Sequence, residues 1–154
     1  MKPDPEDVAS DSRLGDWYAN TVMFGRTPTV LFVNERSYLS ILVPFKPGAS
    51  LLQRFRNRTC ELIGTLVSES GRLRAEEMAL REIRIGRTRS RRVLGVMNDF
   101  AFHVTYRDDY PSACGDYEHL SSLLWRIPCG PLKYEYPITE ASRLLQEGAD
   151  GVSV

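Results

Sequence analysis

Segments with the pattern of β-strands come first in this chain, and segments with the pattern of helices follow them. Aromatic and β-branched residues dominate 16–24, 29–34 and 37–45, with turn-forming residues between them. The first two segments predict a hairpin with a four-residue loop at 25–28, and the third extends the hairpin into a meander. Because strands and helices do not alternate, an α+β fold is favoured over repeated βαβ units.

Helical periodicity begins after residue 48. Ser50 and Gln53 form a capping box ahead of an apolar stripe that predicts a helix over 50–67. Ser90 is expected to cap a helix that runs to about residue 106, with its buried stripe at Val93, Met97, Phe100 and Val104. A lone glycine in that helix, Gly95, is interpreted as a point of close approach to the sheet.

Weaker signals complete the predicted topology. They are a short helical or turn segment at 75–81, a strand at 82–88, a helix after Asp116, a proline-locked connection at 128–137 and a last helix from Thr139 to Gly148. The prediction is therefore an antiparallel sheet of three to four strands, packed with about four helices.

Length and composition set the class of the protein. A chain of 154 residues has the length of one domain, which we place at 13–148 between a flexible acidic arm (1–12) and a disordered tail (149–154). The arm does not resemble a signal peptide, and no apolar run is long enough for a membrane span. Three cysteines without a C-x-x-C pair argue against a disulfide framework, so we expect a cytoplasmic protein.

A cluster of arginines is the strongest candidate for a binding site. Lys plus Arg and Asp plus Glu each number 20, so the net charge is zero and gives no bulk attraction to nucleic acid. Residues 81–92 nevertheless carry six arginines against a single acid, Glu82. Arginine matches phosphate and carboxylate groups, and the start of the helix at 90 adds partial positive charge. The alternative is a solvated surface whose arginines are paired within the protein.

An Asp–His pair is the candidate for catalysis. Asp99 and His103 are four residues apart, so their side chains are neighbours on one helix at the border of its apolar stripe. This arrangement is typical of a general base oriented by a carboxylate, or of a structural hydrogen bond at the helix rim. Cys114, His119 and Cys129 do not have the spacing of a zinc knuckle, so neither a metal nor a cofactor is predicted.

Three motifs also carry a resemblance to a known family. Residues 14–20 read LGDWYAN, residues 31–35 read LFVNE, and residues 91–100 read RRVLGVMNDF. They resemble an uncharacterised bacterial family, a domain of unknown function, whose members carry L-G-D-W-Y-A-N, L-F-V-N-E and R-S-V-L-G-S-M-N-D-F. The resemblance spans about 14–137. It departs at Val96, where the family has a small serine, and at the arm, where the family has a further strand-like segment.

The resemblance implies a site, or a buried polar network, in which polar residues of the first and last motifs meet. The departure at the arm predicts an open sheet edge near the hairpin, where a partner strand could pair. Proteins of this type are expected to be associated with toxin–antitoxin or mobile-element genes. The predicted binding residues are Arg84, Arg87, Arg89, Arg91, Arg92, Asn98, Asp16 and Asn20.

Three functional hypotheses follow. The first is a small binding module that engages an anionic partner, either a protein or a nucleic acid, through the arginine cluster. The second is an enzyme acting on a phosphate-bearing substrate, in which Asp99 and His103 move a proton. The third is a homodimeric interaction subunit that pairs through the open sheet edge.

Overall fold

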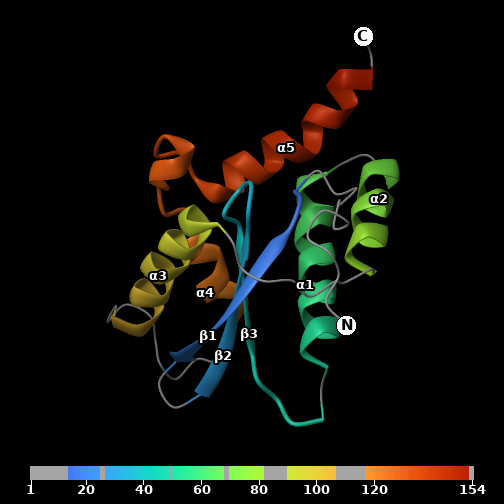
Figure 1. Ribbon diagram of the computed structural model, residues 1–154. Helices are drawn as coiled ribbons and strands as arrows, with labels where there is room; N and C mark the ends of the chain where they lie inside the picture. Colours follow the sequence, from blue (N-terminus) through green and yellow to red (C-terminus); the bar gives the residue numbers. More distant parts are fainter. Residues whose placement is uncertain are drawn as a thin grey trace.

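The computed structural model describes residues 14–24, 27–48, 50–67, 70–81, 90–106 and 117–152 (Figure 1). Three strands come first, β1 (Trp17–Phe24), β2 (Thr27–Asn34) and β3 (Ser40–Pro44). The helices follow, α1 (Leu51–Leu66), α2 (Ser70–Arg81), α3 (Arg91–Tyr106), α4 (Tyr117–Leu124), the short 3-10 helix η2 (Gly130–Leu132) and α5 (Pro137–Val152). The predicted α+β class is confirmed.

The strands form an antiparallel meander in the order β1-β2-β3. Leu31 of β2 lies opposite Asn20 of β1 on one side and Leu42 of β3 on the other. Helices cover both faces of this sheet, with α3 and α4 on one face and α1 on the other (Figure 1). Because β2 is central and covered twice, its sequence is a nearly continuous apolar run instead of an alternating one.

Alternate residues of the strands therefore feed two separate cores. Leu31, Val33 and Leu42 pack with residues of α3 and α4, among them Met97 and Phe100. The intervening strand residues pack with α1 and α5, and Phe32 stacks on Phe55 of α1 at a ring distance of 4.1 Å. A shift of one residue in strand register would exchange the side chains of the two cores, so the register is strongly specified.

The helix caps predicted at Ser50 and Ser90 are confirmed. Among the described residues, however, the side chain of Gln53 bonds to Arg56 and Asn57 and does not return to Ser50 as a capping box requires. The hydroxyl of Ser50 accepts a hydrogen bond from the backbone N–H of Gln53, at 3.2 Å. The hydroxyl of Ser90 accepts one from Val93, also at 3.2 Å, and thereby starts α3. These bonds satisfy N–H groups that have no partner within the helix.

The outer edge of β3 is closed by side chains. The indole Nε1 of Trp125 donates to the carbonyl of Ser40 at 2.6 Å, and the hydroxyl of Ser121 accepts from the N–H of Leu42 at 3.0 Å. Arg58 of α1 donates to the carbonyl of Leu42 at 2.8 Å. These contacts occupy ladder groups that would otherwise be available to another strand.

Several boundaries differ from the sequence prediction. Strand pairing continues to Phe24 opposite Thr27, so the first connection is shorter than the predicted four residues. The segment predicted at 75–81 is a full helix from Ser70, and the last helix starts at Pro137 and runs to Val152, past Gly148. Proline suits the first helical turn, because its missing N–H has no partner there. The predicted strand at 82–88, the arm at 1–12 and the cap at Asp116 lie outside the described residues.

Gly95 is a further correction. It is exposed on α3, and a Cβ built at this position meets nothing within 4 Å among the described residues. The interpretation that it permits close approach to the sheet is wrong.

Candidate functional site

The first and second motifs meet around the side chain of Asn34, which is fully buried. Its amide donates to the carbonyl oxygens of Leu14 and Asp16, at 2.8 and 3.2 Å. Its oxygen accepts from the N–H groups of Arg36 and Ser37 and from the Ser37 hydroxyl, at 3.1, 2.9 and 2.9 Å. Every hydrogen-bonding position of the amide is used, so this network ties the chain before β1 to the turn after β2.

Asp16 belongs to the same network. Its N–H donates to the carboxylate of Glu35 at 3.0 Å, and its carbonyl accepts from the N–H of Glu35 at 2.9 Å. Burial raises the pKa of Asp16, and the positive charge of Arg36 opposes that rise. Because these bonds hold backbone to side chain within the fold, they indicate a structural role for the first motif.

Arg91 and Arg92 are the two members of the arginine cluster whose side chains the structure describes. They occupy the first turn of α3 and both are exposed. Neither forms an ion pair with a carboxylate within the described ranges. Their charges add to the partial positive charge of the helix N-terminus. Arg84, Arg87 and Arg89 lie outside the described residues.

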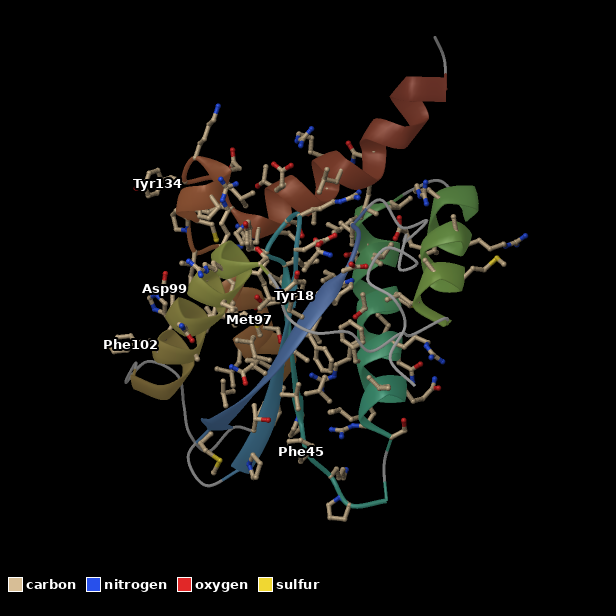
Figure 2. All side chains as sticks on the ribbon, viewed as in Figure 1. Tyr18, Phe45, Met97, Asp99, Phe102 and Tyr134 are labelled. Atoms are coloured by element: carbon tan, nitrogen blue, oxygen red, sulfur yellow. The ribbon has the colours of Figure 1, made fainter. Side chains whose placement is uncertain are left out.

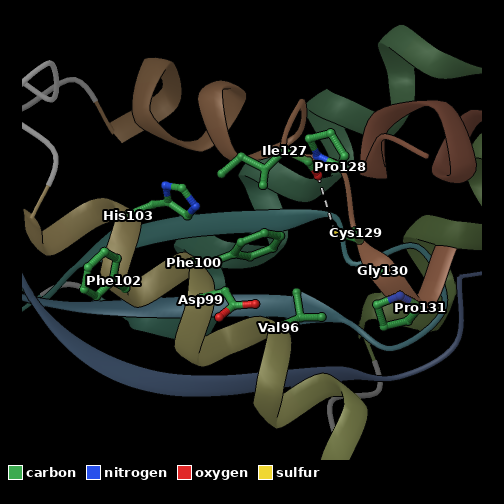
Figure 3. A pocket seen from close by; sticks show the side chains of 10 residues that line it. All are labelled: Val96, Asp99, Phe100, Phe102, His103, Ile127, Pro128, Cys129, Gly130 and Pro131. Atoms are coloured by element: carbon green, nitrogen blue, oxygen red, sulfur yellow. Dashed lines mark hydrogen bonds between the residues drawn. The ribbon is translucent and has the colours of Figure 1, made fainter. Parts of the chain in front are cut away.

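A pocket of about 220 Å³ lies between α3 and the segment 127–131 (Figure 3). Both candidate catalytic residues line it, with the apolar side chains of α3 and of the segment around them. The lining residues are Val96, Asp99, Phe100, Phe102, His103, Ile127, Pro128, Cys129, Gly130 and Pro131. The structure thus joins the predicted Asp–His pair to a part of the chain that the sequence did not connect with it.

Asp99 and His103 are not coupled through the imidazole Nδ1. That atom is shielded from solvent and has no hydrogen-bond partner in the described part of the chain. Figure 3 shows both side chains projecting from α3 on the side of the 127–131 segment. The side chains of Asp99 and His103 therefore face the same pocket, and no hydrogen bond joins them through Nδ1.

Cys129 lies against this pocket and is almost completely buried. Burial, together with the negative charge of Asp99, raises the pKa of its thiol to about 11. The thiol donates to the carbonyl of Ile127 at 3.4 Å. A thiol with this pKa carries very little thiolate at neutral pH, so Cys129 is not an activated nucleophile.

Tyr38 connects the pocket to the arginines. Burial is the main cause that raises the pKa of its phenol, while the positive charge of Arg92 lowers it and the charges of Cys129 and Glu35 raise it. Tyr38 also adopts a left-handed backbone conformation, with φ of 61°. The phenol of Tyr38 is therefore close enough to Arg92 and to Cys129 for their charges to act on it.

Exposed aromatic side chains lie at the pocket and in the chain segment that follows residues 127–131. Phe102 is 61% exposed, and Tyr134 and Tyr136 are 75% and 43% exposed. Figure 2 shows Tyr134, Asp99 and Phe102 projecting at the same edge of the molecule. Lys133 and Tyr134 are consecutive residues with positive φ, 55° and 66°, a backbone conformation that residues other than glycine rarely adopt. We call Arg91, Arg92, Phe102, Tyr134 and Tyr136, with the pocket between α3 and 127–131, the α3 face.

A second cavity, of about 240 Å³, follows the closed edge of β3 between α1 and α4. Three of its polar side chains, Arg58, Ser121 and Trp125, are engaged with the backbone of β3. This cavity therefore belongs to the closure of the sheet edge, and it offers fewer unused polar groups than the pocket beside α3.

The remaining predicted site residues are dispersed. Asn98 is exposed on α3, and Asn20 is exposed on β1, where its side chain accepts from the N–H of Thr21 at 2.9 Å. Within the described ranges no hydrogen bond joins Asp16 or Asn20 to the residues of the third motif. The motifs are thus brought into one domain, but the described contacts do not join these polar residues into one cluster.

Sequence reasoning missed Asn34, Tyr38 and the 127–131 segment as parts of these sites. Asn34 ends an apolar run within the quoted L-F-V-N-E motif, and that position was a signal for a buried turn. The prolines at 128 and 131 marked an ordered connection, but nothing in the sequence specified the helix against which it packs.

The fold and the site define a small α+β domain, with a three-stranded antiparallel sheet between helices and a pocket beside α3. A family model described as a domain of unknown function (DUF6933) matches residues 1–140, so the chain belongs to that family. No curated protein and no solved structure matches it. None of the described helices has the length and hydropathy to cross a membrane, and the described residues contain no cluster of three or more side chains suited to a metal.

Proposed function

We propose that the protein is a protein-binding module that holds an anionic segment of a partner protein on the α3 face. The observation that carries this proposal is the position of Arg91 and Arg92. Both are exposed on the first turn of α3 without an ion pair in the described part of the chain. Charged groups that are not neutralised internally are available to a carboxylate of a partner.

The exposed aromatic residues support a protein as the partner. Tyrosine and arginine are enriched among the residues that dominate binding energy at protein interfaces. Tyr134 and Tyr136 lie exposed in the segment that follows η2, and Phe102 lies on α3. Aromatic side chains that are exposed at or near a pocket favour an interaction surface.

The charge balance of this surface favours a protein over a nucleic acid. Asp99 and Glu135 are exposed on or beside the same face as Arg91 and Arg92. A phosphate backbone would meet these acids along with the arginines, whereas a protein segment can match charges of both signs. The zero net charge of the chain points in the same direction.

The pocket supports binding better than catalysis. The thiol of Cys129 has a pKa of about 11, and Nδ1 of His103 is not held by a carboxylate in the described residues. The described part of the pocket therefore offers neither an activated thiolate nor a base oriented through Nδ1. The hypothesis of an enzyme acting on a phosphate-bearing substrate stays a prediction that turnover assays would test.

The test is selection of peptides from a random display library on the purified protein, followed by affinity measurements with variants. Arg92→Ala/Tyr134→Ala is expected to weaken the selected peptides by at least about tenfold, as loss of interface hot spots does. The control is Arg74→Ala/Met78→Ala, which removes one exposed arginine and one exposed apolar side chain from a different helix, α2. This control is expected to bind within about twofold of the parent.

Two results would contradict the proposal. One is equal weakening by both double variants. The other is an absence of selected peptides combined with binding to single-stranded RNA or duplex DNA. In that case the logarithm of affinity would fall with the logarithm of salt concentration with a slope of about three or more.

A further inference from the structure

The pocket between α3 and residues 127–131 has the size of one side chain. Its volume is about 220 Å³, below the roughly 300–1,000 Å³ of sites that hold a cofactor or a drug-sized ligand. Its walls are more apolar than polar, with Val96 and Phe100 on α3 and Ile127, Pro128 and Pro131 across from them. A long side chain with an apolar stem and a polar end matches this lining.

The charged group at the pocket is negative. Asp99 is exposed at the lining and forms no ion pair within the described ranges. Its charge reaches the far wall, because it is one of the two causes that raise the pKa of Cys129. A group that enters the pocket is therefore attracted if it is positive and repelled if it is negative.

His103 provides a second polar contact. Its Nδ1 is shielded from water and has no hydrogen-bond partner among the described residues. Shielded polar atoms nearly always have a partner in folded proteins, so an atom without one calls for an explanation. A bound N–H donor would supply the missing bond to an unprotonated Nδ1 once the imidazole ring turns toward the pocket, a side-chain rotamer change of the kind common at interfaces.

We propose that this pocket receives an arginine side chain of the partner protein, with its guanidinium bound to the carboxylate of Asp99 and to Nδ1 of His103. This inference rests on the proposed function and names the residue by which the partner is anchored. It joins the two polar groups of the pocket, which lie one helical turn apart on α3 and are neighbours on its surface.

Arginine fits this site better than lysine. The guanidinium is planar and presents five N–H donors in a fixed fork, so it can bind a carboxylate and a nitrogen acceptor at once. It is also weakly hydrated and packs well against flat apolar groups such as Pro128, Pro131 and the ring of Phe102. The ammonium of lysine is a compact charge that keeps its water more strongly.

The pocket is continuous with the arginines of the α3 face. Arg92 lies seven residues before Asp99, about 10 Å along the helix and close to two turns away, so both lie on one side of α3. A partner segment that places a carboxylate at Arg92 can therefore place an arginine in the pocket without a bend. The two interactions have opposite sign, which sets the direction of the bound segment.

The experiment is an NMR titration of the whole protein with N-acetyl-arginine amide, and with the citrulline and lysine analogues as probes. Citrulline has the shape of arginine without its charge. The arginine probe has about fifteen non-hydrogen atoms, so we expect a dissociation constant on the order of a millimolar, with shifts at residues 96–103 and 127–131. The citrulline and lysine probes are expected to bind at least about tenfold and about threefold more weakly, respectively.

Asp99→Asn is the decisive variant, and Glu61→Gln on α1 is its control. Both remove one exposed carboxylate beside a cavity, but Glu61 lines the second cavity. We expect Asp99→Asn to abolish the preference for arginine over citrulline and Glu61→Gln to leave it unchanged. Circular dichroism melting curves confirm that each variant is folded.

The inference is overturned if citrulline binds as well as arginine, or if Asp99→Asn keeps the preference. It is also overturned if probes at about ten times the expected constant leave the pocket residues unshifted. Its failure is distinct from failure of the proposed function. Peptides that depend on Arg92 and Tyr134 but not on Asp99 would sustain the binding module without the arginine pocket. If the pocket binds the arginine probe but the protein selects no peptides, the arginine pocket is supported and the binding module is contradicted.

Discussion

The side-chain amide of Asn34 donates a hydrogen bond of 2.8 Å to the backbone carbonyl of Leu14, twenty residues earlier in the chain. Leu14 and Asn34 belong to the first and second of the three sequence motifs, and the bond joins the entry of β1 to the exit of β2. These two motifs therefore form a structural lock. The α3 face is built from a later part of the chain, and it carries the groups that remain available for binding.

Removing Asn34 is expected to destabilise the whole domain. Asn34→Ala eliminates all five hydrogen bonds of the amide and leaves buried backbone groups without partners. We expect the free energy of unfolding to fall by about 3–5 kcal/mol, measured by urea denaturation. Ser37→Ala removes the hydroxyl bond to Asn34, at 2.9 Å, and the bond that the hydroxyl accepts from the N–H of Leu39, at 3.1 Å, and is expected to cost about 1–2 kcal/mol.

The control for this prediction is Asn20→Ala, because Asn20 is also a motif residue but is exposed on β1. Its loss is expected to change stability by no more than about 0.5 kcal/mol. Comparable losses for Asn34→Ala and Asn20→Ala would refute the structural lock.

Two glycine-to-alanine changes are expected to act in opposite directions. Gly15 has φ of +74°, and a Cβ there would lie 2.5 Å from Oε1 of Glu35, the atom that accepts the N–H of Asp16. Gly15→Ala should therefore destabilise the fold by about 2 kcal/mol or more. Gly95→Ala should stabilise it by about 1 kcal/mol, because the position is an exposed helix interior with room for a methyl group.

Thermal and urea unfolding of the two glycine variants, measured side by side, check this pair. A destabilising Gly95→Ala would mean that α3 is crowded at this position after all. A neutral Gly15→Ala would mean that the turn before β1 relaxes without disturbing Glu35.

The thiol of Cys129 is expected to react slowly and to couple stability to alkaline pH. In a Cys60→Ser/Cys114→Ser background, Cys129 is the single thiol, and its alkylation rate should rise with a midpoint near its pKa of about 11. Asp99→Asn should lower that midpoint, because the negative charge that disfavours the thiolate is removed. An unchanged midpoint would show that Asp99 does not act on Cys129.

The sign of the pH effect follows from the same pKa. The folded state raises the pKa of Cys129 above its ordinary value of 9.0, so folding favours the protonated thiol. The resulting stabilisation is complete below about pH 9 and is lost as the pH rises toward about 11. Urea denaturation at pH 8 and pH 10 should show this loss in the parent and a smaller one in Cys129→Ala.

The local features of the fold were predictable because each depends on residues that are near in sequence. Ser50 and Ser90 cap their helices through bonds to residues three positions later, and the stripe of Val93, Met97 and Phe100 requires only helical spacing. The hairpin loop was placed too long because Pro28 reads as a turn residue. In the structure it is paired with Met23 within the ladder, at the start of β2.

The candidate site was also predictable only where it depends on residues that are near in sequence. Asp99 and His103 were recognisable as neighbours from their spacing, and Arg91 and Arg92 were recognisable as charges at a helix start. The sequence did not show which polar groups lack a hydrogen-bond partner, because hydrogen bonding in the interior is decided by segments far apart in the chain. Asp16 is held by Glu35 nineteen residues away, while Nδ1 of His103 has no partner in the described residues.

The sequence by itself determined the α+β class, the order of strands and helices, the two serine caps and the charged end of α3. These properties follow from patterns of polarity over a few residues, to which the backbone responds locally. Only the tertiary structure decided that residues 127–131 pack on α3 and enclose a pocket with Asp99 and His103. That contact is made within the core on one face of the sheet, where Cys129 and Ile127 pack with Met97 and Phe100. No local pattern encodes which distant segment completes a surface.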